Sequence, residues 1–223
     1  MKTIFIVVEG ETEERFLRKV AYDHFIVNGI HIEAQQWLTN RKLGTQGGGG
    51  NFDKIENHIK RLASRYQANS DVFISTMIDL YAFPKQGNTI YDEEIKPISN
   101  AREKVLLLER KFSDRIAFRN FIPYIQLHEY ESLIMSKPDS LLSFFTDKTK
   151  EIENLTIEVS KMSPEDINET PEGAPSKRII KHIPLYKRQK TTAGVAATAD
   201  IGLPFLRQRC PHFDDWITKL ENV

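Results

Sequence analysis

Short continuous runs of apolar residues, each ended by polar residues, mark the first part of the chain. The runs are residues 4–8, 72–78 and 121–127, while residues 31–38 alternate more loosely between apolar and polar. Runs of this length that are rich in β-branched and aromatic residues are typical of strands buried on both faces, as in parallel sheets. We therefore expect four strands, and Pro123 favours an edge position for the fourth strand or a place at its start.

Segments with apolar residues at helical spacing separate the expected strands. A first helix follows Thr12, which we expect to cap it, and a second begins at Asn51 or Asp53. A third helix, with charges of both signs, is expected over about residues 92–112. This alternation predicts an α/β fold with a mainly parallel, four-stranded sheet flanked by helices. The glycine-rich segment 44–50 is expected to be a loop, because glycine favours irregular backbone conformations.

The sequence pattern changes after about residue 135. Helical segments separated by Pro, Gly and Ser follow, with an acid-rich stretch and then a basic one. We expect an α/β domain over residues 1–135 and a helical C-terminal region over residues 136–223 packed on it. This region is either a small subdomain or part of one compact domain, since a chain of 223 residues is long enough for both arrangements.

The composition narrows the classes of function. Lys and Arg together number 31, as do Asp and Glu, so the net charge is +0. This balance argues against a polybasic protein that binds nucleic acid through bulk charge, although it is compatible with a locally basic groove. The one cysteine, Cys210, excludes an intrachain disulfide and fits the cytoplasm. No apolar stretch approaches about 18 residues, so we expect no membrane span.

Carboxylates follow three of the four expected strands. They are Glu9 after the first, Asp79 after the third, and Glu129 with Glu131 after the fourth; Glu13 lies in the turn of helix that follows Glu9. Ligands bind at the carboxyl ends of parallel strands, so we expect these five side chains to converge, Glu129 and Glu131 on one face if their strand continues. Clustered carboxylates are typical ligands of a hard divalent cation, Mg²⁺ or Mn²⁺. The alternative is that acids after strands only complement helix dipoles.

Several segments resemble a known family. Residues 8–13 (VEGETE) are similar to the first motif of Toprim domains, the metal-dependent fold of topoisomerases, bacterial primases and overcoming-lysogenisation-defect nucleases. Further segments resemble a bacterial Toprim-like family of unknown function that is associated with phage defence: residues 75–81 (STMIDLY), 123–131 (PYIQLHEYE), 174–178 (APSKR) and 210–213 (CPHF). Together they span nearly the whole chain, and they imply a Toprim-like fold.

The resemblance also implies roles for individual residues. Glu9 takes the place of the Toprim general acid/base, and Asp79 takes the place of the first metal-binding aspartate of an Asp-x-Asp motif. Position 81 is Tyr81, so the second aspartate is missing, and we expect Glu129 or Glu131 to supply the absent carboxylate. The implied activity is Mg²⁺- or Mn²⁺-dependent hydrolysis of phosphodiester bonds in DNA or RNA. Because the second aspartate is missing at position 81, two-metal cleavage is in doubt. Cleavage with one metal ion and an inactive site are both compatible with the sequence.

The basic stretch is a candidate for nucleic-acid binding, because residues 176–190 contain six Lys or Arg residues and no acid. We expect phosphate contacts from Lys177, Arg178, Lys187 and Arg188. The alternative is a solvated helix face that balances the preceding acidic stretch. For the whole chain, the second hypothesis is a non-catalytic module that binds nucleic acid or regulates an ATPase partner.

Overall fold

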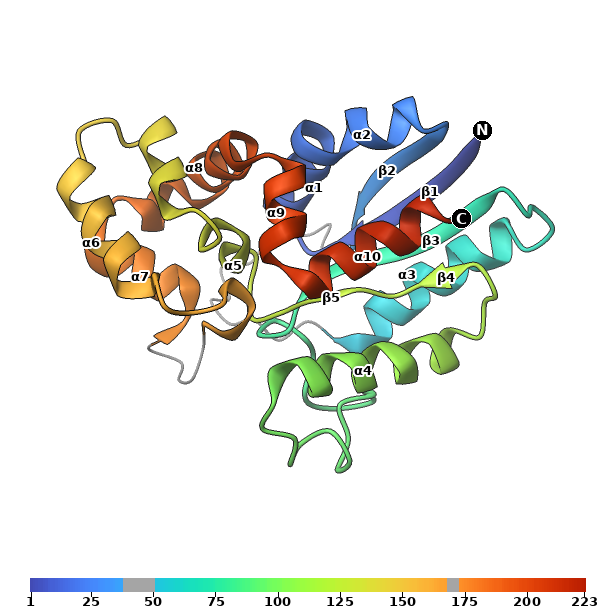
Figure 1. Ribbon diagram of the computed structural model, residues 1–223. Helices are drawn as coiled ribbons and strands as arrows, with labels where there is room; N and C mark the ends of the chain where they lie inside the picture. The colour runs from blue at the N-terminus through green and yellow to red at the C-terminus, as the bar shows by residue number, and fades with distance from the viewer. Residues whose placement is uncertain (38–50, 168–172) are drawn as a thin grey trace.

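A parallel β-sheet forms the centre of the protein (Figure 1), as the computed structural model shows for residues 1–37, 51–167 and 173–223. Its strands are β1 (Lys2–Val8), β2 (Ile30–Gln36), β3 (Val72–Asp79), β4 (Phe121–Ile122) and β5 (Ile125–Gln126). The order is β2-β1-β3-β4, with β5 also paired to β3, and every pairing is parallel. The predicted α/β fold with a mainly parallel sheet is confirmed. The predicted glycine-rich loop lies outside the described residues.

The fourth predicted strand is divided into β4 and β5. Between them, the hydroxyl of Thr76 donates to the carbonyl of Tyr124 at 2.8 Å and accepts the N–H of Tyr124 at 2.9 Å. The Thr76 side chain thus replaces the backbone pairing next to Pro123, which has no N–H to donate. Both short strands lie at one edge of the sheet, as expected from the proline.

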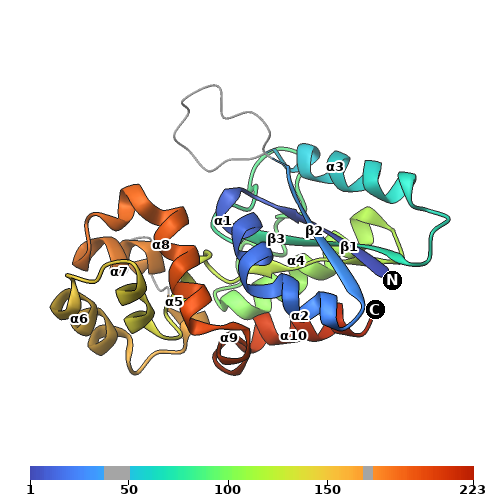
Figure 2. The ribbon, with the colours of Figure 1, turned by 90° about the horizontal axis from the view of Figure 1, so that it is seen from above.

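Helices cover both faces of the sheet (Figures 1 and 2). One face packs against α1 (Glu11–Phe16), the π-helical segment η1 (Leu17–Ala21) and α2 (Tyr22–Val27); the other face packs against α3 (Phe52–Arg65) and α4 (Ala101–Ile116). The continuous apolar run of β1 explains this arrangement, because alternate side chains of a strand point to opposite faces. Ile4, Ile6 and Val8 belong to the first of the two resulting cores, and Phe5 and Val7 to the second.

Two of the predicted helix starts differ from the structure. Gly10, and not Thr12, is the N-cap of α1, and the third helix begins at Ala101 instead of near residue 92. Pro97 accounts for the later start, since a proline inside a helix removes a hydrogen bond and clashes with the preceding turn. The prediction for α3 is confirmed, because the side chain of Asn51 caps it.

The second half of the chain is helical. Its elements are α5 (Glu131–Ile134), η2 (Pro138–Ser143), α6 (Thr149–Val159), η3 (Pro164–Asp166), α7 (Pro175–His182), α8 (Tyr186–Ile201), α9 (Leu203–Arg209) and α10 (Pro211–Glu221). The helices α6, α7 and α8 form a lobe beside the sheet, whereas α10 returns across the face that α1 and α2 also cover (Figure 1). Among the described residues, no helix has the length and apolar character needed to cross a membrane.

Helix α10 is fixed to the sheet by polar and aromatic contacts. The indole N–H of Trp216 donates to the hydroxyl of Ser75 at 2.9 Å, and the Trp216 ring stacks on Tyr124 with centroids 4.2 Å apart. At the end of the chain, Lys2 donates to the backbone carbonyl of Val223. One hydrophobic core extends from β1 to α10, so it crosses the predicted boundary at residue 135.

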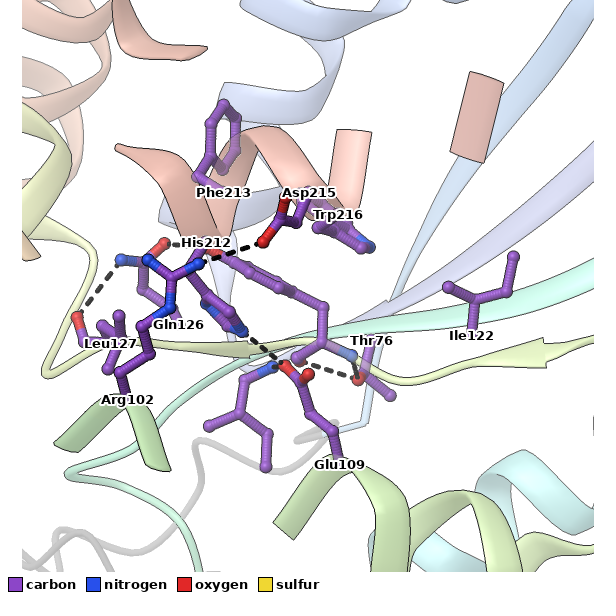
Figure 3. Close-up of polar contacts among 12 residues, drawn as sticks. Thr76, Arg102, Glu109, Ile122, Gln126, Leu127, His212, Phe213, Asp215 and Trp216 are labelled. Atoms are coloured by element: carbon purple, nitrogen blue, oxygen red, sulfur yellow. Dashed lines mark hydrogen bonds and ion pairs between the residues drawn. The ribbon is translucent and has the colours of Figure 1, made fainter. Parts of the chain in front are cut away.

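A buried polar network joins α10 to α4 and β5 (Figure 3). The imidazole of His212 lies 3.1 Å from the carboxylate of Glu109, which also accepts the N–H of Ile125 at 2.9 Å. Both oxygens of Glu165 accept backbone N–H groups at the start of α10, from His212 and Phe213 at 3.0 Å. These contacts give His212 a packing role at the junction of α10 with α4 and β5.

Candidate metal centre

An acidic crevice opens at the carboxyl ends of β1 and β3. We use this name for a cavity of about 520 Å³ that is lined by Glu9, Thr12, Glu13, Asp79, Tyr81, Ala82, Glu129, Tyr130, Glu131 and Lys190. The chain leaves β1 towards β2 on one side and later returns to form β3 on the other side. Such a switch point is where open α/β sheets bind ligands, because the loops on either side diverge there. All five predicted metal ligands therefore line the same cavity.

Strand register places Glu9 and Asp79 next to each other. Val8 pairs with Met77, so Glu9 follows the end of β1 beside the last residues of β3, where Asp79 ends the strand. Glu9 Oε2 and Asp79 Oδ1 are both shielded from solvent, and neither has a hydrogen-bond partner among the described residues. Buried carboxylate oxygens are almost always satisfied in folded proteins, so this pair marks a place where a ligand is expected.

The crevice makes ionisation of its acids unfavourable. Burial, followed by the charges of Glu13 and Glu131, raises the pKa of Glu9 from 4.5 to about 7. Burial also raises the pKa of Asp79 well above its usual value, and the next largest contributions come from Glu9 and Glu13. Like charges in a desolvated site disfavour the ionised forms unless a cation compensates for them.

The other carboxylates already have partners. Glu13 accepts the backbone N–H of Gly10 at 3.0 Å, in a contact that also closes the first turn of α1. Glu129 accepts the backbone N–H of Ser176 at the start of α7. Burial raises the pKa of Glu13 even though this N–H lowers it.

Glu131 is held from α8. The hydroxyl of Tyr186 donates to its carboxylate at 3.2 Å, and the ammonium of Lys190 lies 3.2 Å from the same oxygen. Tyr186 and Lys190 are four residues apart, so they share one face of α8. Burial still raises the pKa of Glu131, with Glu129 as the next largest contribution.

Glu129 and Glu131 reach the crevice by a different route from the one predicted. The strand ends at Gln126, and His128 has a left-handed backbone with φ of 63°, so the chain turns before Glu129 and α5 begins at Glu131. A turn, and not the alternation of a continuing strand, therefore directs both carboxylates inward. His128 itself is buried, and its Nε2 lies 2.7 Å from the carbonyl of Glu165, which fits a structural role.

The donor set fits a hard divalent cation. Among the described residues, no three Asp, Glu, His or Cys side chains converge closely enough to form a complete metal site as they stand. Carboxylate oxygens are the ligands that Mg²⁺ and Mn²⁺ prefer, and Glu9 and Asp79 each present an unsatisfied oxygen. These two residues are therefore best suited to hold such an ion.

Lys190 is a residue of the crevice that sequence reasoning missed. It belongs to the basic stretch of the sequence, but no sequence pattern links it to Glu131. Burial opposes its charge, yet Glu131 and Glu129 raise the pKa of Lys190 above its usual value. Thr12, which the sequence predicts to be a helix cap, also lines the crevice. Its hydroxyl lies 3.0 Å from that of Thr191.

The predicted nucleic-acid contacts lie on α7 and α8, and they differ from one another. Lys177, Lys187 and Arg188 are exposed, and none of the ion pairs found among the described residues involves them. Arg178 is only 17% exposed; its guanidinium pairs with Glu158 at 2.7 Å and donates to the carbonyl of Gly173 at 2.8 Å. Arg178 is therefore occupied by contacts inside the protein, whereas phosphate contacts from the three exposed residues stay a prediction.

Comparison with known proteins gives a family and distant structural neighbours. Residues 8–221 match the family described as Domain of unknown function (DUF4276). No curated protein matches the chain significantly. Solved structures of the C-terminal region of the Xanthomonas campestris pv. campestris OLD protein are similar to it. The structure phased with mercury has a TM-score of 0.40 and 14% identity, over 99% of this chain and 98% of that one. The structure phased with platinum has a TM-score of 0.39 and 14% identity, over 99% and 96%.

Proposed function

The chain belongs to the family described as Domain of unknown function (DUF4276), and we propose that it is a metal-dependent nuclease that hydrolyses phosphodiester bonds in DNA or RNA. One observation carries this proposal: two neighbouring carboxylates, Glu9 and Asp79, end parallel strands in a crevice and each keep an oxygen without a hydrogen-bond partner among the described residues. The resemblance of residues 8–13 to the first Toprim motif supports the same activity, with a role in phage defence.

Glu9 and Asp79 would hold Mg²⁺ or Mn²⁺, with Glu131 or Glu129 as the next carboxylate and Glu13 beside them. When bound, the ion would polarise phosphate oxygens and lower the pKa of an attacking water. The negative charge of the crevice suits it to a cation and makes it unfavourable for a phosphate alone. Neutralisation of the carboxylates is thus the condition for a nucleic acid to enter.

The protein's own residues supply proton transfer and charge. Glu9 would move the proton, in the place that the resemblance gives to the Toprim general acid/base. In the metal-free crevice, burial and the neighbouring carboxylates raise its pKa to about 7. Lys190 contributes a positive charge beside Glu131 and compensates for part of the repulsion in the crevice. Tyr186 donates to Glu131 and so orients its carboxylate.

The test is cleavage of labelled single- and double-stranded DNA and RNA in Mg²⁺, Mn²⁺ or EDTA. The variants are Glu9→Gln and Asp79→Asn, and Glu33→Gln on the exposed face of β2 is the matched control. We expect cleavage by the wild type and by Glu33→Gln only with metal, and a loss of about a hundredfold or more in both crevice variants. Undiminished cleavage by folded Asp79→Asn protein would contradict this site.

A second function, a non-catalytic module that binds nucleic acid or regulates an ATPase partner, is favoured by a different observation. Three of the five carboxylates are already bound to protein groups, and Tyr81 occupies the position of the second Toprim aspartate. Such a module would keep its affinity for nucleic acid in EDTA and would show no turnover under any metal condition.

A further inference from the structure

A basic groove lies between the first helices of the chain and α8, which pack side by side (Figures 1 and 2). We use this name for a cavity of about 480 Å³ that is lined by Arg15, Arg18, Lys19, Thr192, Val195 and Ala196. Three of these residues are cations, and no acid is among them. The groove is distinct from the predicted basic stretch on α7 and α8, since its cations come from the N-terminal helix.

The cations of the groove are accessible to a ligand. The side chains of Arg15 and Arg18 are 50% and 75% exposed, and they pair with Glu11 and Glu14 one helical turn earlier. Exposed ion pairs of this kind contribute little free energy, because water screens them. A guanidinium also has five N–H donors, so each arginine can bind a phosphate oxygen in addition to its intrahelical partner.

The backbone at the groove departs from a regular α-helix. Arg18 and Lys19 belong to the π-helical segment η1, where the hydrogen bonds join residues five apart. Such segments are rare and occur frequently at functional sites, since the wider turn changes the direction of the side chains. This irregularity is an observation independent of the charges.

The basic groove adjoins the acidic crevice. Thr12 lines the crevice and bonds to Thr191, the residue before Thr192 of the groove. Seven residues of helix separate Thr12 from Lys19, which is about 10 Å at 1.5 Å per residue. Along the axis of a B-form duplex, that length corresponds to about three phosphates of one strand, at about 3.4 Å each.

We propose that the basic groove binds the sugar–phosphate backbone of a nucleic-acid strand that passes through the acidic crevice. That the strand passes through the crevice rests on the proposed function, whereas binding in the groove does not. The charges favour nucleic acid as the ligand, because three cations lie close together on consecutive turns of helix and a nucleic-acid strand carries a negative charge at every phosphate. The carboxylates of the crevice repel the same strand until a cation neutralises them, so the groove supplies the attraction that holds the strand near the site.

The test measures binding of a fluorescein-labelled oligonucleotide, single-stranded or duplex, by anisotropy in EDTA over a series of salt concentrations. The variant is Arg15→Ala/Arg18→Ala/Lys19→Ala. The matched control, Lys54→Ala/Arg61→Ala/Arg65→Ala, removes the same charge from exposed positions of α3 in the opposite layer. Each phosphate contact contributes about 0.7 to the salt slope for a single strand, so the groove variant is expected to lose about 2. Its Kd at about 0.1 M salt is then expected to rise about a hundredfold, and that of the control to change little.

The outcomes separate the groove from the nuclease proposal. A salt slope that falls by about 2 in the groove variant supports binding of nucleic acid in the groove, even if the wild type shows no cleavage with any metal. An unchanged slope and Kd would overturn the groove, even if metal-dependent cleavage is found. Polyglutamate serves as a competitor: if it displaces the oligonucleotide at equal charge concentration and depends on the same three residues, the surface recognises acidic proteins and the nucleic-acid proposal is overturned.

Discussion

The ammonium of Lys190 lies 3.2 Å from the buried carboxylate of Glu131, and this ion pair connects α8 to the start of α5 at the acidic crevice. The crevice is formed by both halves of the chain. Glu9 and Asp79 come from strand ends, whereas Lys190, the one cation among the described residues that line the crevice, comes from α8. A single hydrophobic core extends from β1 to α10, so the elements that form the crevice are packed against one another.

Replacement of Lys190 by Met is expected to destabilise the protein. Removal of one partner of a buried ion pair leaves an uncompensated charge, and here the side chain of Lys190 is 40% exposed while that of Glu131 is 8% exposed. Because water screens the exposed partner, we expect a loss of about 1–2 kcal/mol in the free energy of unfolding, measured with urea at neutral pH. The control Lys187→Met, on an exposed position of the same helix, should change it by less than about 0.5 kcal/mol. Equal effects of the two substitutions would contradict the role of the pair.

Ionisation of Glu9 is expected to make the metal-free protein less stable as the pH rises. The pKa of Glu9 is about 7 in the folded protein and about 4.5 when unperturbed, so the folded state binds more protons between these values. Its stability therefore falls from about pH 4.5 to about pH 7 and is constant above that. We expect Glu9→Gln in EDTA to be more stable than the wild type by about 2 kcal/mol at about pH 8, allowing for partial exposure, and equally stable near pH 4.

The measurement is urea unfolding of both proteins at several pH values, with Glu33→Gln as the control for a carboxylate outside the crevice. The control should follow the wild-type profile. A Glu9→Gln protein whose stability relative to the wild type is the same at all pH values would show that Glu9 titrates normally.

The sequence predicts the framework of this site better than its details. The apolar runs of β1 and β3 fix where those strands end, and strand order then brings Glu9 and Asp79 together. The break between β4 and β5 was not predicted beyond the effect of Pro123, because it depends on the hydroxyl of Thr76, which occupies the gap from a neighbouring strand. The strand propensity of residues 121–127 alone contains no information about a contact from another strand.

Ion pairs between distant segments were also beyond prediction. Lys190 and Arg178 occur in the same basic stretch, yet Lys190 points to the crevice and Arg178 pairs with Glu158 of α6. The local sequence around the two residues is similarly basic, so it predicts the same role for both. Their roles differ because α7 and α8 pack against different neighbours. The same reason explains why the basic groove, with cations from α1 and η1 and a wall from α8, had no signature in the sequence.

Glu158 is expected to stabilise the helical lobe in a pH-dependent manner. Partial burial opposes its ionisation, but hydrogen bonds from His182, Lys181 and Arg178 prevail and lower the pKa of Glu158 from 4.5 to about 2. A depressed folded-state pKa gives stability that is fully present above about pH 4.5 and is lost as the pH falls towards 2. We expect Glu158→Gln to lose about 1–2 kcal/mol at pH 7, after allowance for screening.

The comparison is with Glu153→Gln, an exposed position on the same helix, in urea unfolding from about pH 7 to about pH 3. The difference between wild type and Glu158→Gln should narrow as the pH falls, whereas Glu153→Gln should stay within about 0.5 kcal/mol of the wild type. A difference that widens at low pH would have the wrong sign for a depressed pKa and would exclude this role for Glu158.

Attachment of α10 to the sheet is expected to depend on the hydrogen bond between Trp216 and Ser75. The indole N–H donates to the Ser75 hydroxyl, which itself donates to the carbonyl of Ile122 at 2.6 Å, so one serine serves both α10 and β4. Trp216→Phe keeps most of the stacking on Tyr124 but leaves the serine without its donor, and should cost about 1–2 kcal/mol. Ser75→Ala should cost more, because it removes the partner of both the indole N–H of Trp216 and the carbonyl of Ile122. In a double-mutant cycle the two residues should show a coupling energy of about 1 kcal/mol, measured by urea unfolding, whereas additive effects would mean that the bond contributes nothing to the attachment of α10.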